Sequence, residues 1–434
     1  MKFYNRDKEI KLLRDVEKES MSNAQMTVMT GRRRIGKTTL IKQAFNSQPF
    51  IYFFVARKSE SMLCQELAAI VNESSGEDLG DFSSFPRLFR ALMNLSKRKP
   101  LTLVFDEFQN LQYAGRQLFS EIQNIWDSNK AESHINLVLC GSVYSMMTRI
   151  FDDAQEPLYG RATHRINIKP FTTATLKEIL HDFNPNYMPD DLLTFYMLTG
   201  GVAKYVEQLI NSNAYTHEAM IRHVLSFGSF FITEGREMLR DEFGQEFGNY
   251  FSILQAIADG NTERGNITNV VGIETGGYLD KLEKIYNIID RHRSFLQPPG
   301  TRSVKYYIHD NFLTFWFRFI HKYRSAIEID NMEYVQQKVM ADYNTFSGFI
   351  LERYFRQKYA ETGLYNIVTN YWKKGKDEID LIAVNETDKQ LVIAECKRQA
   401  NRIDLEYLKQ KARDICARHK NWAIQFKELS IEDM

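Results

Sequence analysis

The first 170 residues alternate short apolar runs with stretches in which apolar residues recur at helical spacing. A run that is apolar at nearly every position is typical of a strand buried on both faces of a sheet. Five such runs lie at residues 25–30, 50–55, 101–105, 136–140 and 165–168. Stretches with helical spacing lie between them at 39–45, 59–71 and 85–95. Strands that alternate with helices predict an α/β fold with a parallel sheet.

The pattern changes after residue 170. From 172 to about 240 it is helical throughout, which predicts a helical lid. Three short helices follow, and then two strands around a Pro-Pro-Gly turn, at 250–258, 266–271, 276–286, 288–293 and 304–308. Three helices and a β-hairpin predict a winged helix.

The C-terminal part contains both strand-like apolar runs and stretches with helical spacing of apolar residues. Two apolar runs at 377–384 and 391–397 flank a polar loop and predict two strands, with a helix before them at 346–354 and one after them at 405–417. The aromatic-rich run 311–320 has helical spacing, which favours a core or interface segment over a base-stacking surface. We therefore expect four domains, at residues 1–170, 171–240, 241–312 and 313–434.

Composition narrows the class of protein. The chain has 434 residues, too many for one ordinary core, and its net charge of +1 gives no overall field that favours nucleic acid or membrane. Its four cysteines are scattered without a C-x-x-C pair, which favours a reduced compartment over a disulfide framework or a cysteine zinc site. The N-terminal residues lack the apolar run of a signal peptide, and no run approaches a membrane span of about 20 residues. We therefore expect a cytoplasmic protein without a membrane segment.

Residues 31–38 match the pattern G-x-x-x-x-G-K-[ST] at every specified position, between the first strand and a helix. Glycines let backbone N–H groups surround phosphates, and a helix N-terminus favours negative charge. In this pattern Lys37 reaches the β- and γ-phosphates, and the Thr38 hydroxyl ligates Mg²⁺. The expected nucleotide contacts are Gly31, Arg32, Arg33, Arg34, Ile35, Gly36, Lys37, Thr38 and Thr39. The pattern does not separate ATP from GTP.

Further candidates lie beside later strands. Asp106 and Glu107 follow the third strand, where an acidic pair suits an aspartate that holds Mg²⁺ and a glutamate that deprotonates the attacking water. Ser142 follows the fourth strand, either as a contact of the γ-phosphate or as part of a strand-to-helix turn. Arg161 precedes the fifth strand, either as a surface arginine or as a γ-phosphate contact, in cis or from a second subunit.

A second candidate site lies near the C-terminus. If the last two expected strands form an antiparallel hairpin with Val384 opposite Leu391, then Asp380 lies opposite Glu395. Alternation places Lys397 on the same face as Glu395. Facing carboxylates repel each other, and a divalent cation between them would relieve the repulsion. Lys397 would then orient or activate a water; the alternative is a structural ion pair at a sheet edge.

Basic residues gather on the expected winged helix. Two lie on the presumed recognition helix and four on or near the wing: Lys281, Lys284, Arg291, Arg293, Arg302 and Lys305. Such a set suits contact with the phosphates of DNA. The alternative is a packing module whose lysines are merely solvated.

The phosphate loop and the Asp106–Glu107 pair resemble those of AAA+ and STAND-type ATPases. Residues 3–10 resemble the "F-x-G-R-x-x-E-L" box of these proteins, with Arg6 and Glu9 in place and Asn5 where glycine is usual. The resemblance implies binding and hydrolysis of ATP with Mg²⁺.

The set Asp380, Glu395 and Lys397 resembles the PD-(D/E)xK nuclease superfamily, with Ile379 where the family name has proline. In that family the acids bind Mg²⁺ or Mn²⁺ for phosphodiester hydrolysis. Glu352, on the helix before the strands, corresponds to an additional metal-facing glutamate of the family. The resemblance makes Glu352, Asp380, Glu395 and Lys397 the candidate catalytic set, with Asp380 and Glu395 as metal ligands.

As a whole the chain resembles a prokaryotic ATPase family, common in archaea, with a C-terminal nuclease-like domain of unassigned function. The implied fold is α/β: a P-loop AAA+-like parallel sheet, a helical lid, a winged helix and a C-terminal α/β restriction-endonuclease-like domain. The implied function is ATP binding and hydrolysis coupled to Mg²⁺-dependent action on, or binding to, DNA. The alternative is a STAND-type regulatory switch whose nuclease-like domain does not cleave. Assembly into a homo-oligomer stays open.

Overall fold

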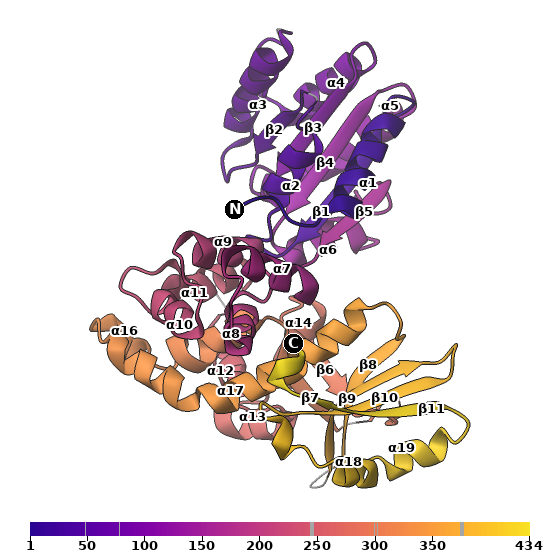
Figure 1. The fold of residues 1–434 in the computed structure, drawn as a ribbon. Coiled ribbons are helices and arrows are strands. Elements are labelled where there is room, and N and C mark those ends of the chain that lie inside the picture. Colours follow the sequence, from indigo (N-terminus) through magenta and orange to yellow (C-terminus); the bar gives the residue numbers. More distant parts are fainter. Residues whose placement is uncertain (48, 78, 244–246, 299, 302, 374–376) are drawn as a thin grey trace. The chain divides into compact units, whose positions relative to one another are not determined.

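A computed structural model describes the chain except for residues 48, 78, 244–246, 299, 302 and 374–376 (Figure 1). The chain divides into two compact units, each with its own core. One is Asn5–Lys169, and the other combines Met1–Tyr4 with Pro170–Met434. The first unit spans nearly the same residues as the first expected domain. Within the part of the chain that the structure describes, no helix is both long and apolar enough to cross a membrane.

The first unit is built on a five-stranded parallel sheet. Its strand order is β2-β3-β4-β1-β5, and every neighbouring pair is parallel. The strands are β1 Gln25–Gly31, β2 Ile51–Phe54, β3 Leu101–Asp106, β4 Ile135–Gly141 and β5 His164–Ile168. All five expected strands are present, and the P-loop AAA+-like sheet is confirmed. Their apolar runs are long because the sheet is covered on both faces.

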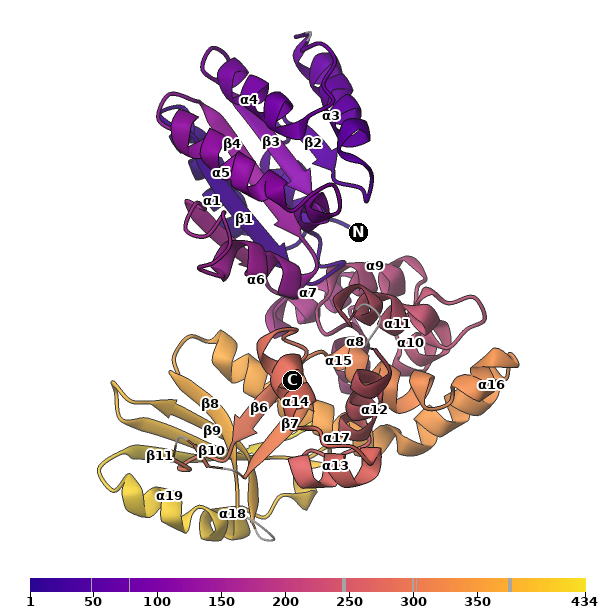
Figure 2. The same ribbon diagram turned by 180° about the vertical axis from the view of Figure 1, so that it is seen from behind.

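Helices cover the two faces of this sheet. They are α1 Asp7–Glu19, α2 Lys37–Ala44, α3 Glu60–Ser75, α4 Phe85–Ser96, α5 Gln117–Asn129 and α6 Tyr144–Asp152, with a short 3₁₀ helix η1 at Phe108–Tyr113. One continuous apolar cluster joins α3, α4, α5 and α6 to one face of the sheet. Helices α1 and α2 contact each other and lie on the other face (Figures 1 and 2). This layering leaves the carboxyl ends of the strands for the loops that carry the candidate site.

The second unit begins with helices. They are α7 Thr173–Phe183, α8 Pro189–Thr199, α9 Ala203–Asn211, α10 His217–Val224 and α11 Phe230–Phe243. Then come α12 Phe247–Ala258, α13 Arg264–Val271 and α14 Gly276–Lys284, followed by the antiparallel hairpin of β6 Ile289–Arg293 and β7 Val304–Ile308. The three helices and the hairpin occur in the order that the sequence predicts.

The second unit ends in a four-stranded mixed sheet of order β11-β10-β9-β8, in which only β10 and β11 run parallel. The strands are β8 Ile367–Trp372, β9 Glu378–Asn385, β10 Gln390–Cys396 and β11 Ala423–Leu429. Only β9 and β10 were predicted. The expected helix 405–417 is divided into α18 Leu405–Lys411 and α19 Arg413–Arg418.

The remaining segments of the second unit are helical. They are α15 Asn311–Phe315, the π-helix η2 Trp316–His321, α16 Arg324–Glu328, α17 Met332–Glu361, and the short 3₁₀ helices η3 Ala400–Arg402 and η4 Ile431–Asp433. The aromatic run that forms α15 and η2 is buried, so its prediction as core is confirmed.

Helix α17 has 30 residues and joins the parts of the second unit. It packs against α7 and α8 and also against β8, β9 and β10. Its Glu361 accepts hydrogen bonds from the backbone and the side chain of Thr173, at the start of α7. Its Gln357 accepts one from the hydroxyl of Tyr196 on α8, at 2.7 Å. Helices and mixed sheet therefore share one framework, and the expected boundaries at 240 and 312 stay predictions.

Candidate functional site

The loop between β1 and α2 has a backbone that requires its glycines. Gly36 has φ 97°, in the left-handed region that glycine adopts readily. At Gly31, with φ 153°, an added Cβ would lie 3.0 Å from the carbonyl oxygen of Ile168 on β5. Ile35 is buried and anchors the loop. The chain thus forms the cradle that the phosphate-loop pattern predicts, at the N-terminus of α2.

Lys37 lies inside this cradle. Its ammonium group donates to the carbonyl oxygens of Gly31 at 2.8 Å and Arg32 at 3.3 Å, and the residue is 7% exposed. Burial lowers the pKa of Lys37, against the nearby charges of Glu107 and Asp106. The carbonyl groups hold the ammonium in the loop, where a phosphate would be a stronger partner.

Asp106 ends β3 and lies beside Thr38. Its Oδ2 accepts a hydrogen bond from the Thr38 hydroxyl at 3.1 Å and another from the hydroxyl of Tyr52. Its Oδ1 accepts from the backbone N–H of Glu107 at 3.0 Å. Tyr52 was not predicted from the sequence, because its hydroxyl reaches Asp106 from a neighbouring strand. The hydroxyl and carboxylate oxygens of Thr38 and Asp106 are the donors that Mg²⁺ prefers, so this set fits the ion.

Hydrogen bonds fix the side chain of Glu107 at the carboxyl ends of β3 and β4. The Ser142 hydroxyl lies 2.8 and 3.0 Å from its two carboxylate oxygens, and the side-chain amide of Gln109 donates to Oε2. The backbone of Glu107 is left-handed, with φ 55°. The structure therefore brings Ser142 to Glu107 rather than leaving it as a plain turn residue. Gln109, on η1, is a neighbour that the sequence pattern did not indicate.

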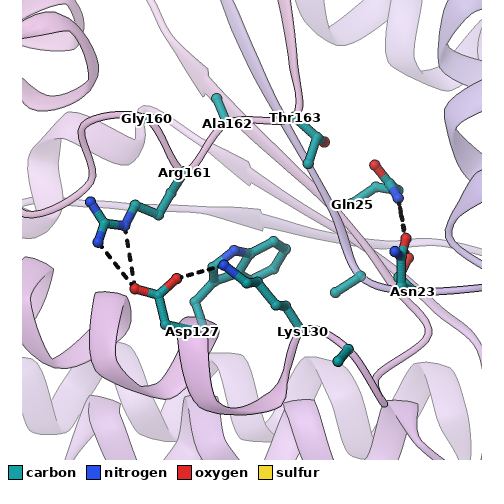
Figure 3. A pocket seen from close by; sticks show the side chains of 11 residues that line it. Asn23, Gln25, Asp127, Lys130, Gly160, Arg161, Ala162 and Thr163 are labelled. Carbon is teal, nitrogen blue, oxygen red and sulfur yellow. Dashed lines mark hydrogen bonds and ion pairs between the residues drawn. The ribbon is translucent and has the colours of Figure 1, made fainter.

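Arg161 lies at the opposite edge of the sheet. It precedes β5, whose first residue His164 pairs with Thr27 near the start of β1. Its guanidinium contacts Asp127 at 3.1 Å, beside a cavity of about 610 Å³ that Lys130 also lines (Figure 3). A seven-residue strand spans roughly 20 Å, so β1 separates Arg161 from the phosphate loop. The expected γ-phosphate contact in cis is therefore corrected; contact from a second subunit stays a prediction.

The N-terminal box has a local explanation for its departure from the family pattern. Asn5 has φ 55°, and asparagine tolerates this left-handed conformation better than most residues other than glycine. The next residue, Arg6, also has a positive φ, and its guanidinium lies 3.4 Å from Glu9. Asparagine thus serves the backbone where the pattern has glycine.

The C-terminal residues Asp380, Glu395 and Lys397 lie together. Strands β9 and β10 pair with Val384 opposite Leu391, the register that the sequence predicts. The Lys397 ammonium lies between the two carboxylates, 3.2 Å from Asp380 and 2.9 Å from Glu395. Burial and the charge of Glu395 raise the pKa of Asp380. Burial lowers the pKa of Lys397 and Asp380 raises it, with a net upward shift.

Glu352, Arg356 and Lys411 complete this carboxylate–lysine site. Burial, and then the charge of Asp380, raise the pKa of Glu352 to about 8. Arg356 lies 3.5 Å from Glu352 and donates to the backbone carbonyl of Asp380 at 2.7 Å. Lys411 donates to Glu395 at 2.6 Å, and its side chain is only 6% exposed.

The ammonium group of Lys397 lies where a metal ion is expected, between Asp380 and Glu395. Among the described residues, no group of three or more His, Cys, Asp or Glu side chains is arranged to hold a metal ion. The two carboxylates do converge on one positive charge, but that charge is the ammonium of Lys397. Carboxylate oxygens are ligands that suit Mg²⁺, but both groups are paired here, Asp380 with Lys397 and Glu395 with Lys397 and Lys411.

The basic set predicted on the winged helix is partly used for packing. Lys305 pairs with Glu378 of β9 at 2.9 Å and lies over the ring of Trp372 on β8. On α14, Lys284 lies 3.8 Å from Asp280. Arg302 lies outside the described residues. Lys305 is therefore paired within the second unit, and contact of this basic set with DNA stays a prediction.

Comparisons with known proteins match two separate parts of the chain. Residues 3–209 match the model of an ATPase domain found predominantly in Archaea. Residues 316–414 match a domain of archaeal and bacterial proteins of unknown function. A protein of Methanocaldococcus jannaschii, described as uncharacterized, is 31% identical over 410 residues, which cover 91% of this chain and 87% of that protein.

The comparison with solved structures supports the fold. A Walker-type ATPase of Pyrococcus abyssi matches with a TM-score of 0.56 and 20% identity, over 73% of this chain and 96% of that one. At this identity the likeness shows the fold alone.

Proposed function

This chain belongs to the archaeal ATPase family represented by that domain and by the M. jannaschii protein, and on this premise we propose that it binds ATP with Mg²⁺ and hydrolyses it. The observation that carries the proposal is the contact between Thr38 and Asp106, beside a loop that holds Lys37. Mg²⁺, when bound, neutralises phosphate charge and orients the γ-phosphate. Thr38 and Asp106 are the residues that would hold it.

The remaining residues of the first unit take roles that follow from their contacts. Lys37 would give up its carbonyl partners for the β- and γ-phosphates. Glu107 lies where the strand ends meet and would accept a proton from the attacking water. Ser142 and Gln109 hold the Glu107 carboxylate in one orientation.

Binding of ATP and of GTP to the unchanged chain and to Lys37→Ala, measured by calorimetry with Mg²⁺, tests the proposal. We expect binding of ATP by the unchanged chain and its loss in Lys37→Ala. Lys42→Ala, on the exposed face of the same helix, is the matched control. Tight ATP binding that persists in Lys37→Ala would contradict the assignment.

For the second unit we propose Mg²⁺-dependent action on, or binding to, DNA at the carboxylate–lysine site. Support comes from the mutual contact of Asp380, Glu395 and Lys397, the donor set of a nuclease-like site. The second candidate is a module that binds without cleaving, as part of a STAND-type switch. The ion pair of Lys411 and Glu395, whose side chains are 6% and 12% exposed, favours it, because this pair already neutralises one carboxylate.

A cleavage assay separates these two candidates. The full chain would be mixed with labelled single- and double-stranded DNA and RNA, with Mg²⁺ or Mn²⁺, with and without ATP. Cleavage that disappears in Asp380→Ala supports the nuclease. Binding without cleavage, accompanied by ATP hydrolysis, supports the switch.

A further inference from the structure

The carboxylate of Asp106 accepts a hydrogen bond from the neighbouring strand, donated by the hydroxyl of Tyr52. Tyr52 lies on β2, where it pairs with Val104, two residues before Asp106 on β3. Residues two apart on a strand point to the same face of the sheet. The Tyr52 ring therefore shares that face with Asp106, and its hydroxyl reaches the end of the neighbouring strand.

The hydrogen bonds of Asp106 divide into fixed and exchangeable ones. A carboxylate offers about four lone-pair positions, two on each oxygen. One position on Oδ1 is taken by the backbone N–H of Glu107, and the two on Oδ2 by the hydroxyls of Tyr52 and Thr38. In the proposed function Thr38 turns its oxygen toward Mg²⁺, which frees one position on Oδ2. The hydroxyl of Tyr52 can keep its position on Oδ2.

The Tyr52 hydroxyl is suited to the donor role. The phenol of a tyrosine carries an O–H group that donates a hydrogen bond, and here it donates to Oδ2 of Asp106. The pairing of β2 with β3 keeps this donor beside the carboxylate.

We propose that Tyr52 is a positioning residue for the magnesium-facing carboxylate: its hydroxyl fixes the orientation of Asp106 and so sets how strongly Mg²⁺ strengthens nucleotide binding. The inference rests on the proposed ATP site. It concerns a residue on β2, the edge strand of the sheet, that has no contact of its own with the phosphate-loop backbone in the interactions described above. Tyr52 thus acts through Asp106 rather than on the nucleotide.

The test is the Mg²⁺ dependence of ATP binding by Tyr52→Phe, which removes the hydroxyl and keeps the ring. The full chain would be titrated with ATP by calorimetry, first in EDTA and then across a series of Mg²⁺ concentrations. A hydrogen bond to a charged group is worth enough for the Mg²⁺ concentration at half-effect to rise roughly tenfold. Binding in EDTA should stay within about twofold of the unchanged chain, because Lys37 and the loop are untouched.

Tyr113→Phe serves as the matched control, since this tyrosine is in the same unit and is 53% exposed. An unchanged Mg²⁺ midpoint in Tyr52→Phe would overturn the inference, as would a lower one, which would make Tyr52 a competitor of the ion. Equal weakening with and without Mg²⁺ would also overturn it, since this indicates a merely structural role. Absence of ATP binding by the unchanged chain would overturn the proposed function itself, and the inference with it.

Discussion

The chain carries two sites in which carboxylates and lysines lie close together, and they distribute charge in opposite ways. In the nucleotide site, the hydrogen bonds of Asp106 and Glu107 described above come from hydroxyl, amide and backbone donors, while Lys37 is bound by carbonyl groups. In the C-terminal site, Asp380 and Glu395 are bridged by Lys397. In the first site the lysine and the carboxylates bind neutral groups, so their charges can still act on a ligand or a metal ion. In the second site the lysine and the carboxylates form ion pairs with each other.

This difference has a physical consequence. Carboxylates bound by neutral donors keep their negative charge available to a divalent cation. Carboxylates bridged by ammonium groups are already compensated, so that a metal ion must first displace a lysine. The two sites are therefore expected to respond differently when one member is removed: the first in turnover, the second in stability.

The largest effect is expected from Glu107→Gln in the nucleotide site. Loss of the general base should lower ATP turnover by roughly a thousandfold, while ATP binding persists because the loop is intact. Steady-state hydrolysis and calorimetric binding measure the two effects separately. Glu121→Gln, on the exposed face of α5, is the control. Unchanged ATP turnover in Glu107→Gln would show that Glu107 is not the general base of the nucleotide site.

In the C-terminal site, Lys411→Met should lower the free energy of unfolding by about 2 kcal/mol, because Glu395, whose side chain is 12% exposed, loses one of its two charged partners and keeps Lys397. Urea unfolding followed by tryptophan fluorescence reports on this unit, since it contains Trp316, Trp372 and Trp422, three of the four tryptophans. Lys409→Met, on the same helix with a 44% exposed side chain, should change the free energy by less than about 1 kcal/mol. Equal effects of the two variants would show that Lys411 does not stabilise the site.

The pH dependence of stability sharpens the comparison further. The pKa of Glu352 is raised in the folded chain to about 8, mainly by burial and then by Asp380. A raised folded-state pKa means that its contribution to stability is fully present below the unfolded value of about 4.3 and is lost as pH rises toward 8. Glu352→Gln should therefore gain stability relative to the unchanged chain between pH 5 and pH 9, as urea unfolding at several pH values would detect. A constant difference across this range would contradict the assignment.

The first unit was more predictable than the second because its strands are buried on both faces. Such strands appear in sequence as nearly continuous apolar runs, and all five were found. Strand β11 was missed because most of its residues are exposed, as suits the edge of a sheet, and β8 because Thr369 and Asn370 interrupt its apolar pattern. In both cases the pairing of strands, which sequence spacing does not encode, decides the structure.

The residues of the candidate sites also differ in how far the sequence predicts their contacts. The positions from Gly31 to Thr38 follow from one local motif, whereas the contacts of Tyr52, Arg356 and Lys411 depend on elements that meet only in the folded chain. Arg161 differs from these residues, because its position before the fifth strand already indicates the edge of the sheet at which it lies. A residue that precedes a strand of a parallel sheet lies at the amino edge, and the phosphate loop follows its strand at the carboxyl edge.

Helix α17 has a mechanical consequence for the C-terminal site. Its 30 residues form a rod of about 45 Å, because each residue adds about 1.5 Å. Glu361, near one end of the rod, is tied to Thr173, while Glu352 and Arg356, about one to three turns away, border the carboxylates. A stiff rod does not let these positions move independently. A displacement of α7 would therefore reach Asp380 as a tilt of the whole helix rather than fade along the chain.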